Sequence, residues 1–141
     1  SRYAEAWFNY HAPRCGLSWR AESRGFRPHL ATEALSHHAE ERLIENTVPL
    51  SLTRPYPEKI LLHDLAEASL VIALLEGEHR PMVHEQFPDW IDRIRYWNVH
   101  DIDVKSPQHA LPLIEAEVEA LIQNLKGGHA LGARKGFMVE F

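Results

Sequence analysis

The only thiol in the sequence is Cys15, which lies five residues before Arg20. A thiolate is a good nucleophile, and an arginine near it can hold an anion such as phosphate. Residues 17–23 alternate apolar and polar side chains, which is typical of a strand and not of the first turn of a helix. We therefore interpret Cys15 as an ordinary loop thiol. A single cysteine also excludes an internal disulfide framework and a zinc site made of cysteines.

Ten histidines raise the question of a metal site. His37 and His38 are adjacent and diverge on a helix, while His79 and His84 are five residues apart and do not share a helix face. The sequence has neither an H-E-x-x-H nor an H-x3-H pattern. We expect surface histidines, and neither a metal ion nor a cofactor.

Composition limits the classes of protein to consider. The chain has 141 residues, 45% of them hydrophobic and 25% charged, which predicts one folded domain with a core. Its 20 acidic and 15 Lys and Arg residues give a net charge of −5, which argues against nucleic-acid binding. No apolar run approaches the ~18 residues of a membrane span, and no signal peptide opens the chain. These features predict a cytoplasmic protein with no membrane partner.

Helical periodicity and short apolar runs alternate along the chain, which predicts an α/β fold. We expect a small, open, mostly parallel sheet with helices on both faces. The expected helices are 3–8, 32–45, 78–85 and 112–125, and the expected strands are 17–23, 69–75 and 94–99. The run 69–75 is continuously apolar, as in a strand buried on both faces. Pro112 is expected to begin the last helix, with Glu115, Glu117 and Glu119 on its solvent side.

Several segments, in order, resemble the low-molecular-weight protein-tyrosine phosphatase family. The opening SRYAEAWFN is similar to the helix after that family's phosphate loop, and RAESRG at 20–25 is similar to its Ser-Ala-Gly strand end. Further similar segments are the third-strand region, the helix after it and the approach to the catalytic acid, at 64–74, 78–82 and 96–101. The resemblance covers residues 1–125 and implies a phosphatase-I-like fold, which arsenate reductases share.

The resemblance implies hydrolysis of a phosphate monoester, such as phosphotyrosine on a protein, through a cysteinyl-phosphate. In the family, the cysteine of a C-x5-R loop attacks phosphorus and an aspartic acid protonates the leaving group. Asp101 matches that acid, and Asp103 is the alternative because Ile102 stands where the family has proline. Arg24 and Phe26 match the substrate-side loop, where an arginine would help hold an anion.

Ser1 matches the serine directly after the arginine of the phosphate loop. The resemblance therefore implies that the first strand, the nucleophile and the loop lie upstream of Ser1, and that the chain as given is inactive. The alternative function is a non-catalytic remnant that binds a partner or an anion through the old site. An arsenate reductase is a third option, but it needs further cysteines.

Residues 126–141 differ in composition from the rest of the chain. A glycine-rich connector at 126–136 leads to a strand-like segment at 137–141. In the family, the first strand is central and buried, so its absence would leave an apolar slot in the sheet. We hypothesise that residues 137–141 fill this slot, either in their own chain or in a neighbouring copy, which would give a homodimer by strand exchange.

Overall fold

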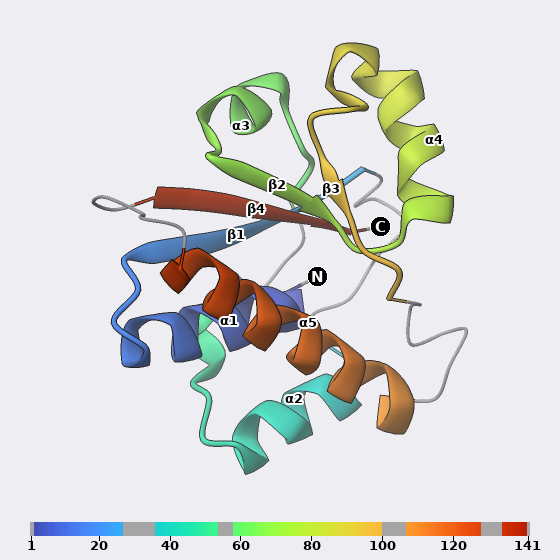
Figure 1. The fold of residues 1–141 in the computed structure, drawn as a ribbon. Coiled ribbons are helices and arrows are strands. Elements are labelled where there is room, and N and C mark those ends of the chain that lie inside the picture. The colour runs from blue at the N-terminus through green and yellow to red at the C-terminus, as the bar shows by residue number, and fades with distance from the viewer. Residues whose placement is uncertain (1, 27–35, 54–57, 100–106, 128–133, 141) are drawn as a thin grey trace.

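The computed structural model describes residues 2–26, 36–53, 58–99, 107–127 and 134–140 (Figure 1). Within these ranges the sheet has four parallel strands in the order β1-β4-β2-β3. The strands are β1 (Trp19–Gly25), β2 (Leu70–Ala73), β3 (Arg95–Tyr96) and β4 (Arg134–Glu140). The predicted α/β class and the open parallel sheet are therefore confirmed.

Helices cover both faces of this sheet (Figure 1). One layer holds α1 (Arg2–Arg14), α2 (His37–Glu45) and α5 (Pro107–Gly127). The other layer holds α3 (Leu62–Glu67) and α4 (Glu76–Gln86), and two 3-10 turns, η2 (Leu50–Leu52) and η3 (Pro88–Trp90), lie in the connections. Of the described helices, none has a stretch long and apolar enough to cross a membrane.

Strand β2 shows how the two layers are held. Ile72 belongs to the apolar cluster shared with α1, α2 and α5, while its neighbours Val71 and Ala73 belong to the cluster shared with α3 and α4. Successive side chains of a strand point to opposite faces, so a continuous apolar run serves both layers. The prediction of a strand buried on both faces is confirmed for 70–73.

The C-terminal segment lies inside the sheet. β4 pairs with β1 over the whole of both strands, from Trp19↔Arg134 to Gly25↔Glu140, and with β2 over four positions. The hypothesis that the tail fills an interior position is confirmed for its own chain. The strand begins at Arg134, three residues earlier than expected, and α5 extends to Gly127, so both ends of the predicted connector are shorter. Phe141 lies outside the described residues.

Three predictions about individual residues are wrong. Helix α5 begins at Pro107, so Pro112 lies inside it, because Pro107 offers an equally suitable first position. Glu115 is not on the solvent side but is 8% exposed. His79 is buried, and its Nδ1 accepts a hydrogen bond of 3.1 Å from the backbone N–H of Leu75 at the start of α4.

Candidate functional site

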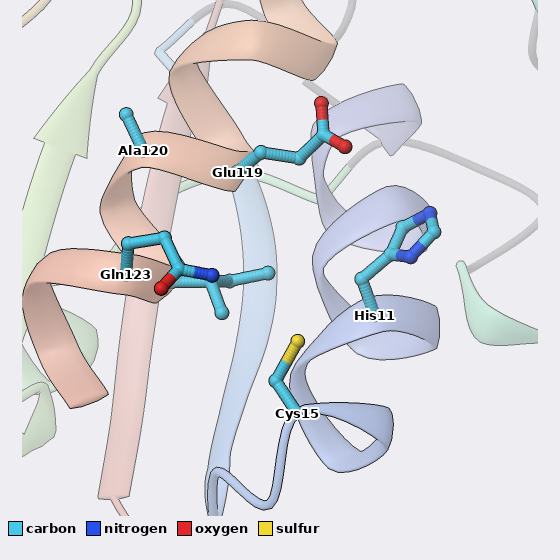
Figure 2. Close-up of a pocket in the computed structure, with 6 residues that line it drawn as sticks. His11, Cys15, Glu119, Ala120 and Gln123 are labelled. Carbon is cyan, nitrogen blue, oxygen red and sulfur yellow. The ribbon is translucent and has the colours of Figure 1, made fainter.

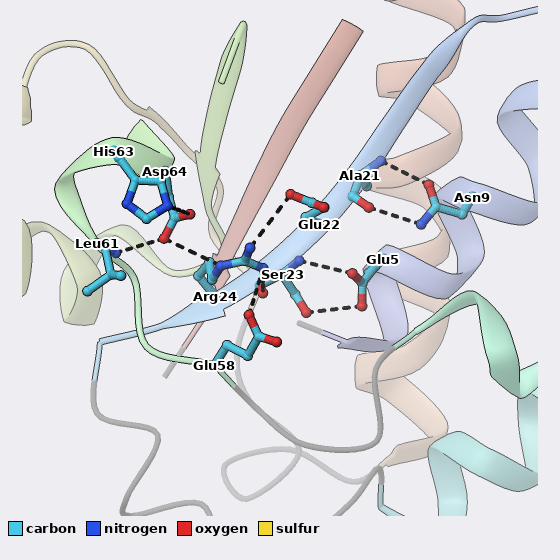
Figure 3. Close-up of polar contacts among 10 residues, drawn as sticks. All are labelled: Glu5, Asn9, Ala21, Glu22, Ser23, Arg24, Glu58, Leu61, His63 and Asp64. Carbon is cyan, nitrogen blue, oxygen red and sulfur yellow. Dashed lines mark hydrogen bonds and ion pairs between the residues drawn. The ribbon is translucent and has the colours of Figure 1, made fainter. Parts of the chain in front are cut away.

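Helix α1 runs antiparallel to β1, and side chains on one helix face define this alignment (Figure 3). Near the helix start, Glu5 bonds to Ser23, and one turn later Asn9 bonds to Ala21. The first turn of α1 therefore lies at the end of the sheet where the strands have their carboxyl termini. Because Gly25 is paired with Glu140, the last residue of β4 lies at this same end.

This carboxyl end is the candidate functional site. Open parallel sheets bind their ligands outside the carboxyl ends of the strands. The first backbone N–H groups of a helix have no partner within the helix, and the helix dipole there favours an anion. At this end the first turn of α1 lies beside the end of β1, and β4 ends next to β1.

Glu5 and Asn9 hold α1 against β1 by completing the hydrogen bonding of the strand's outer edge. Asn9 accepts from the Ala21 N–H at 2.9 Å and donates to the Ala21 carbonyl at 3.0 Å. Glu5 accepts from both the N–H and the hydroxyl of Ser23, each at 3.1 Å, and from the Thr53 hydroxyl at 2.5 Å. An unpaired strand edge would otherwise expose these groups.

The outer edge continues beyond Ser23 through a short pairing with the chain around Lys59. The Gly25 N–H donates to the Glu58 carbonyl at 2.7 Å, and the Ile60 N–H donates to the Gly25 carbonyl at 2.9 Å. The carboxyl end of β1 is thus fixed by α1 on one part of its edge and by the 58–60 segment on the next.

Arg24 lies near the carboxyl end of β1, where its side chain faces carboxylates (Figure 3). Its guanidinium lies 3.4 Å from Asp64 and 3.6 Å from both Glu22 and Glu58, and it donates to the Ser23 carbonyl at 2.8 Å. The side chains of Arg24 and Asp64 are 9% and 5% exposed. Three acidic groups compensate the positive charge, so Arg24 is placed to position β1 and not to hold a substrate anion.

Asp64 connects this cluster to α3. One of its oxygens accepts the Leu61 backbone N–H at 2.8 Å, which satisfies a free N–H at the start of the helix. The other lies 3.4 Å from Nε2 of the exposed His63. Asp64 therefore links Arg24 on β1 to α3, which lies in the helix layer opposite α1.

The other described residue of the predicted substrate-side loop is Phe26, which directly follows β1. Phe26 is 1% exposed and packs in the α3–α4 cluster, with its ring 5.8 Å from that of His79, so it has no free face for a substrate ring. Ser1, Asp101 and Asp103 lie outside the described residues. Among the described side chains, no group of three or more His, Cys, Asp or Glu is placed to hold a metal ion.

Cys15 lies at the opposite end of α1. It directly follows Arg14, the last residue of the helix, and thirteen residues of helix span about 20 Å. Here the helix offers carbonyl oxygens, which do not stabilise an anion. Cys15 is half-buried, as expected of a loop thiol, and cannot serve a site at the carboxyl end.

A pocket of about 280 Å³ lies beside this thiol, between the end of α1 and the face of α5 (Figure 2). The Cys15 sulfur points into the space between the two helices (Figure 2). The lining residues are His11, Cys15, Glu119, Ala120, Ile122 and Gln123. His11 and Cys15 lie four residues apart at the end of α1, and both line this pocket.

The sequence did not predict a polar network that joins α1, α2 and α5, the three helices on one face of the sheet. Tyr3 on α1 and Arg42 on α2 both donate to the carboxylate of Glu115 on α5, Arg42 also through Nη2 at 3.0 Å. Burial raises the pKa of Tyr3 well above its ordinary range, and the hydrogen bond to Glu115 adds to this. The hydrogen bond to Glu115 likewise raises the pKa of Arg42.

Part of the polar contacts described above, those of Glu5 and Asn9, had a signal in the sequence. Glu5 and Asn9 are four residues apart, so they share one helix face, and that face carries buried side chains on both sides of Glu5. The partners of Glu115 had no local signal, because Tyr3 is 112 positions away.

No protein-family model, curated protein or solved structure matches the chain. A proposed function therefore draws no support from a matching protein, and it has to be argued from this chain, above all from the geometry at the carboxyl end of the sheet.

Proposed function

We propose that this chain forms the body of a low-molecular-weight phosphatase-type domain, which hydrolyses a phosphate monoester on a protein or a small molecule. The observation that carries the proposal is that the first turn of α1 lies beside the end of β1, next to the interior strand β4, at the carboxyl end of the parallel sheet. In a strand-loop-helix unit, the loop surrounds phosphate with backbone N–H groups; here β4 follows α1 in the sequence, so residues 1–141 contain no loop from β4 into α1. The resemblance of residues 1–125 to the phosphatase family, segment by segment in order, supports the same proposal.

In this proposal the residues have separate tasks. The first turn of α1 stabilises the phosphate charge, and Glu5 fixes that turn against β1. Asp101, or Asp103, donates a proton to the leaving oxygen and then takes a proton from the attacking water. The nucleophilic thiolate and the clamping arginine would have to come from a C-x5-R segment, a pattern that residues 1–141 do not contain. Arg24 orders the end of β1 through its three carboxylates.

A second function is favoured by the position of Cys15. The 141-residue polypeptide has its only thiol at the far end of α1, so by itself it would bind an anion at the carboxyl end without forming a phospho-enzyme. It would then act as a phosphate-binding or partner-binding module.

The first test is the reading frame that encodes this chain. Sequencing upstream of Ser1 should reveal a cysteine seven residues before Ser1 and an arginine immediately before it. Any other upstream sequence contradicts the phosphatase proposal and leaves the binding module.

The second test uses the 141-residue polypeptide and two probes, inorganic phosphate and an aryl phosphate ester. We expect phosphate to shift the amide NMR signals of the first turn of α1 and of Gly25, and we expect no turnover of the ester. Sulfate titrated in parallel reports the contribution of charge alone. Turnover that disappears in Cys15→Ser would contradict the assignment of Cys15 as a non-catalytic thiol.

A further inference from the structure

The pocket of about 280 Å³ between α1 and α5 lies at the far end of α1 from the candidate functional site (Figure 2). Polar side chains reach it from both sides: Cys15 directly follows α1, and Glu119 and Gln123 belong to α5. In Figure 2 the Glu119 carboxylate extends from α5 towards α1, and the Cys15 sulfur points into the same space. The function proposed for the carboxyl end of the sheet uses none of these groups.

The polar side chains of this pocket are not used to hold the fold together. Among the described residues, no hydrogen bond or ion pair engages the side chains of Cys15, Glu119 or Gln123. The His11 ring packs 4.7 Å from the Trp7 ring, and its Nε2 is buried without a hydrogen-bond partner in the described chain. Polar groups that converge on a cavity and lack protein partners are typical of a ligand site.

The charge around the pocket favours a cation. With histidine neutral, Glu119 is the only charged residue in the lining. Arg14 does not compensate it, because its guanidinium donates to the Tyr10 carbonyl at 2.7 Å and lies 3.6 Å from the Tyr10 ring, away from the lining. The C-terminal end of α1 adds to the effect, since the helix dipole there also favours a positive charge.

The size and the apolar part of the lining limit the ligand further. The volume is just under the ~300 Å³ at which pockets for drug-sized ligands begin, so the ligand is small. Ala120 and the buried Ile122 supply an apolar wall, which suits a short hydrocarbon chain. A primary ammonium has three N–H donors, and the Glu119 carboxylate and the Gln123 carbonyl are acceptors for two of them.

We propose that this pocket binds a small primary amine in its ammonium form. Glu119 is the counter-ion, Gln123 is a second acceptor, and the aliphatic chain of the amine lies against Ala120 and Ile122. The pocket is independent of the proposed phosphatase function, because the carboxyl end of the sheet lies at the opposite end of α1.

The Cys15 thiol provides a direct test, because it is the only thiol of the 141-residue polypeptide. Its sulfur displaces one half of a symmetric disulfide, which forms a mixed disulfide on the protein and releases the other half as a thiol. The two probes are bis(2-aminoethyl) disulfide, which carries ammonium groups, and bis(2-hydroxyethyl) disulfide, which is neutral and of similar size. Intact-mass measurements give the rate for each probe, and the ratio of the two rates is the preference for the ammonium.

We expect Glu119→Gln to lower this preference about two- to fivefold, which is the factor of a partly exposed ion pair. Glu117→Gln is the matched control, because Glu117 is exposed on the same helix and does not line the pocket. Comparing variants cancels the intrinsic difference in reactivity between the probes. A preference that Glu119→Gln leaves unchanged, or that Glu117→Gln lowers equally, overturns the proposal.

A further variant separates binding in the pocket from the effect of a charge near the thiol. Ala120→Leu keeps Glu119 and narrows the pocket, and leucine is well tolerated at an exposed helix position. We expect this variant to lower the preference to the level of Glu119→Gln. If the preference stays as in the unaltered chain, the carboxylate acts through its charge alone and the binding site is refuted.

Amide NMR with n-propylammonium chloride gives an independent, non-covalent measurement. We expect saturable shifts of the signals of Cys15 and of residues 119–123, which sodium chloride titrated in parallel does not reproduce. Equal shifts with the two salts, or no saturable shift, would contradict the amine site.

Discussion

Glu5, in the first turn of α1, accepts hydrogen bonds from both the backbone N–H and the hydroxyl of Ser23 on β1, each at 3.1 Å. Glu5 is 3% exposed, so both bonds are shielded from water. One buried carboxylate thus closes the edge of a strand and fixes where the helix starts. The geometry of the carboxyl end depends on this contact.

Replacing Glu5 with glutamine should destabilise the fold by about 1–3 kcal/mol, because one side-chain oxygen becomes an amide that cannot accept from its donors. The free energy of unfolding in urea measures the change. Glu117→Gln is the matched control, since Glu117 is exposed on α5 and should change stability by less than about 0.5 kcal/mol. Equal effects of the two substitutions would contradict the role given to Glu5.

The Tyr3–Glu115 hydrogen bond predicts a cost of about 1–3 kcal/mol for Tyr3→Phe, because the bond involves a charged, buried acceptor. Tyr10→Phe is the control, since the Tyr10 hydroxyl makes a 3.2 Å contact with Thr47 in an exposed position. Chemical unfolding at neutral pH distinguishes them, and a larger loss in Tyr10→Phe would argue against the network.

The same tyrosine predicts a loss of stability in alkali. Burial and the Glu115 carboxylate raise the pKa of Tyr3 in the folded state, whereas an unfolded tyrosine has a pKa of about 10. The folded state therefore holds this proton more tightly. The stabilisation is complete below pH about 10 and declines as the pH rises above it. Unfolding curves from pH 8 to about 11 should decline more steeply for the unaltered chain than for Tyr3→Phe.

Arg24→Gln should cost about 3–5 kcal/mol, because it leaves the buried carboxylate of Asp64 without its positive partner. Arg93→Gln is the control, as Arg93 is exposed and lies over the Trp90 ring at 3.9 Å. Thermal unfolding measures both variants. If Arg24→Gln weakens phosphate binding while leaving stability unchanged, the arginine holds the anion and the structural assignment is wrong.

The interior position of β4 predicts that Val139→Pro unfolds the domain or destabilises it by about 3 kcal/mol or more, because proline removes a ladder donor and is excluded from interior strands. Val139→Thr keeps the N–H and the β-branched shape, and it serves as the control. Circular dichroism and urea unfolding report the result. A folded Val139→Pro protein of normal stability would place β4 outside the sheet.

Parts of the fold could be predicted from the sequence, because the patterns that indicate them are local. The run at 69–75 is apolar on both faces and became β2, and the alternation at 17–23 became most of β1. Helix boundaries were less accurate, since Pro107 and Pro112 are both acceptable first residues and only packing selects between them. Short α3 carried too few residues for a periodic pattern.

Less of the candidate site than of the fold could be predicted from the sequence. Arg24 was expected to face an anion, but the charges that surround it come from Glu22, Glu58 and Asp64, which the sequence gives no reason to bring together. Glu115 was assigned to the solvent side of α5 together with Glu117 and Glu119, because carboxylates are usually exposed. Its buried state depends on Tyr3 and Arg42, far away along the chain.

The sequence by itself determined the alternation of helices and strands, the acidic charge, the single thiol and the strand character of the C-terminal segment. These are properties of composition and of short-range periodicity. Only the tertiary structure decided that Cys15 and the carboxyl end of the sheet lie at opposite ends of α1, and that three carboxylates compensate the charge of Arg24. Each of these depends on contacts between distant segments, which are selected by burial and charge pairing in the folded chain and leave no local pattern.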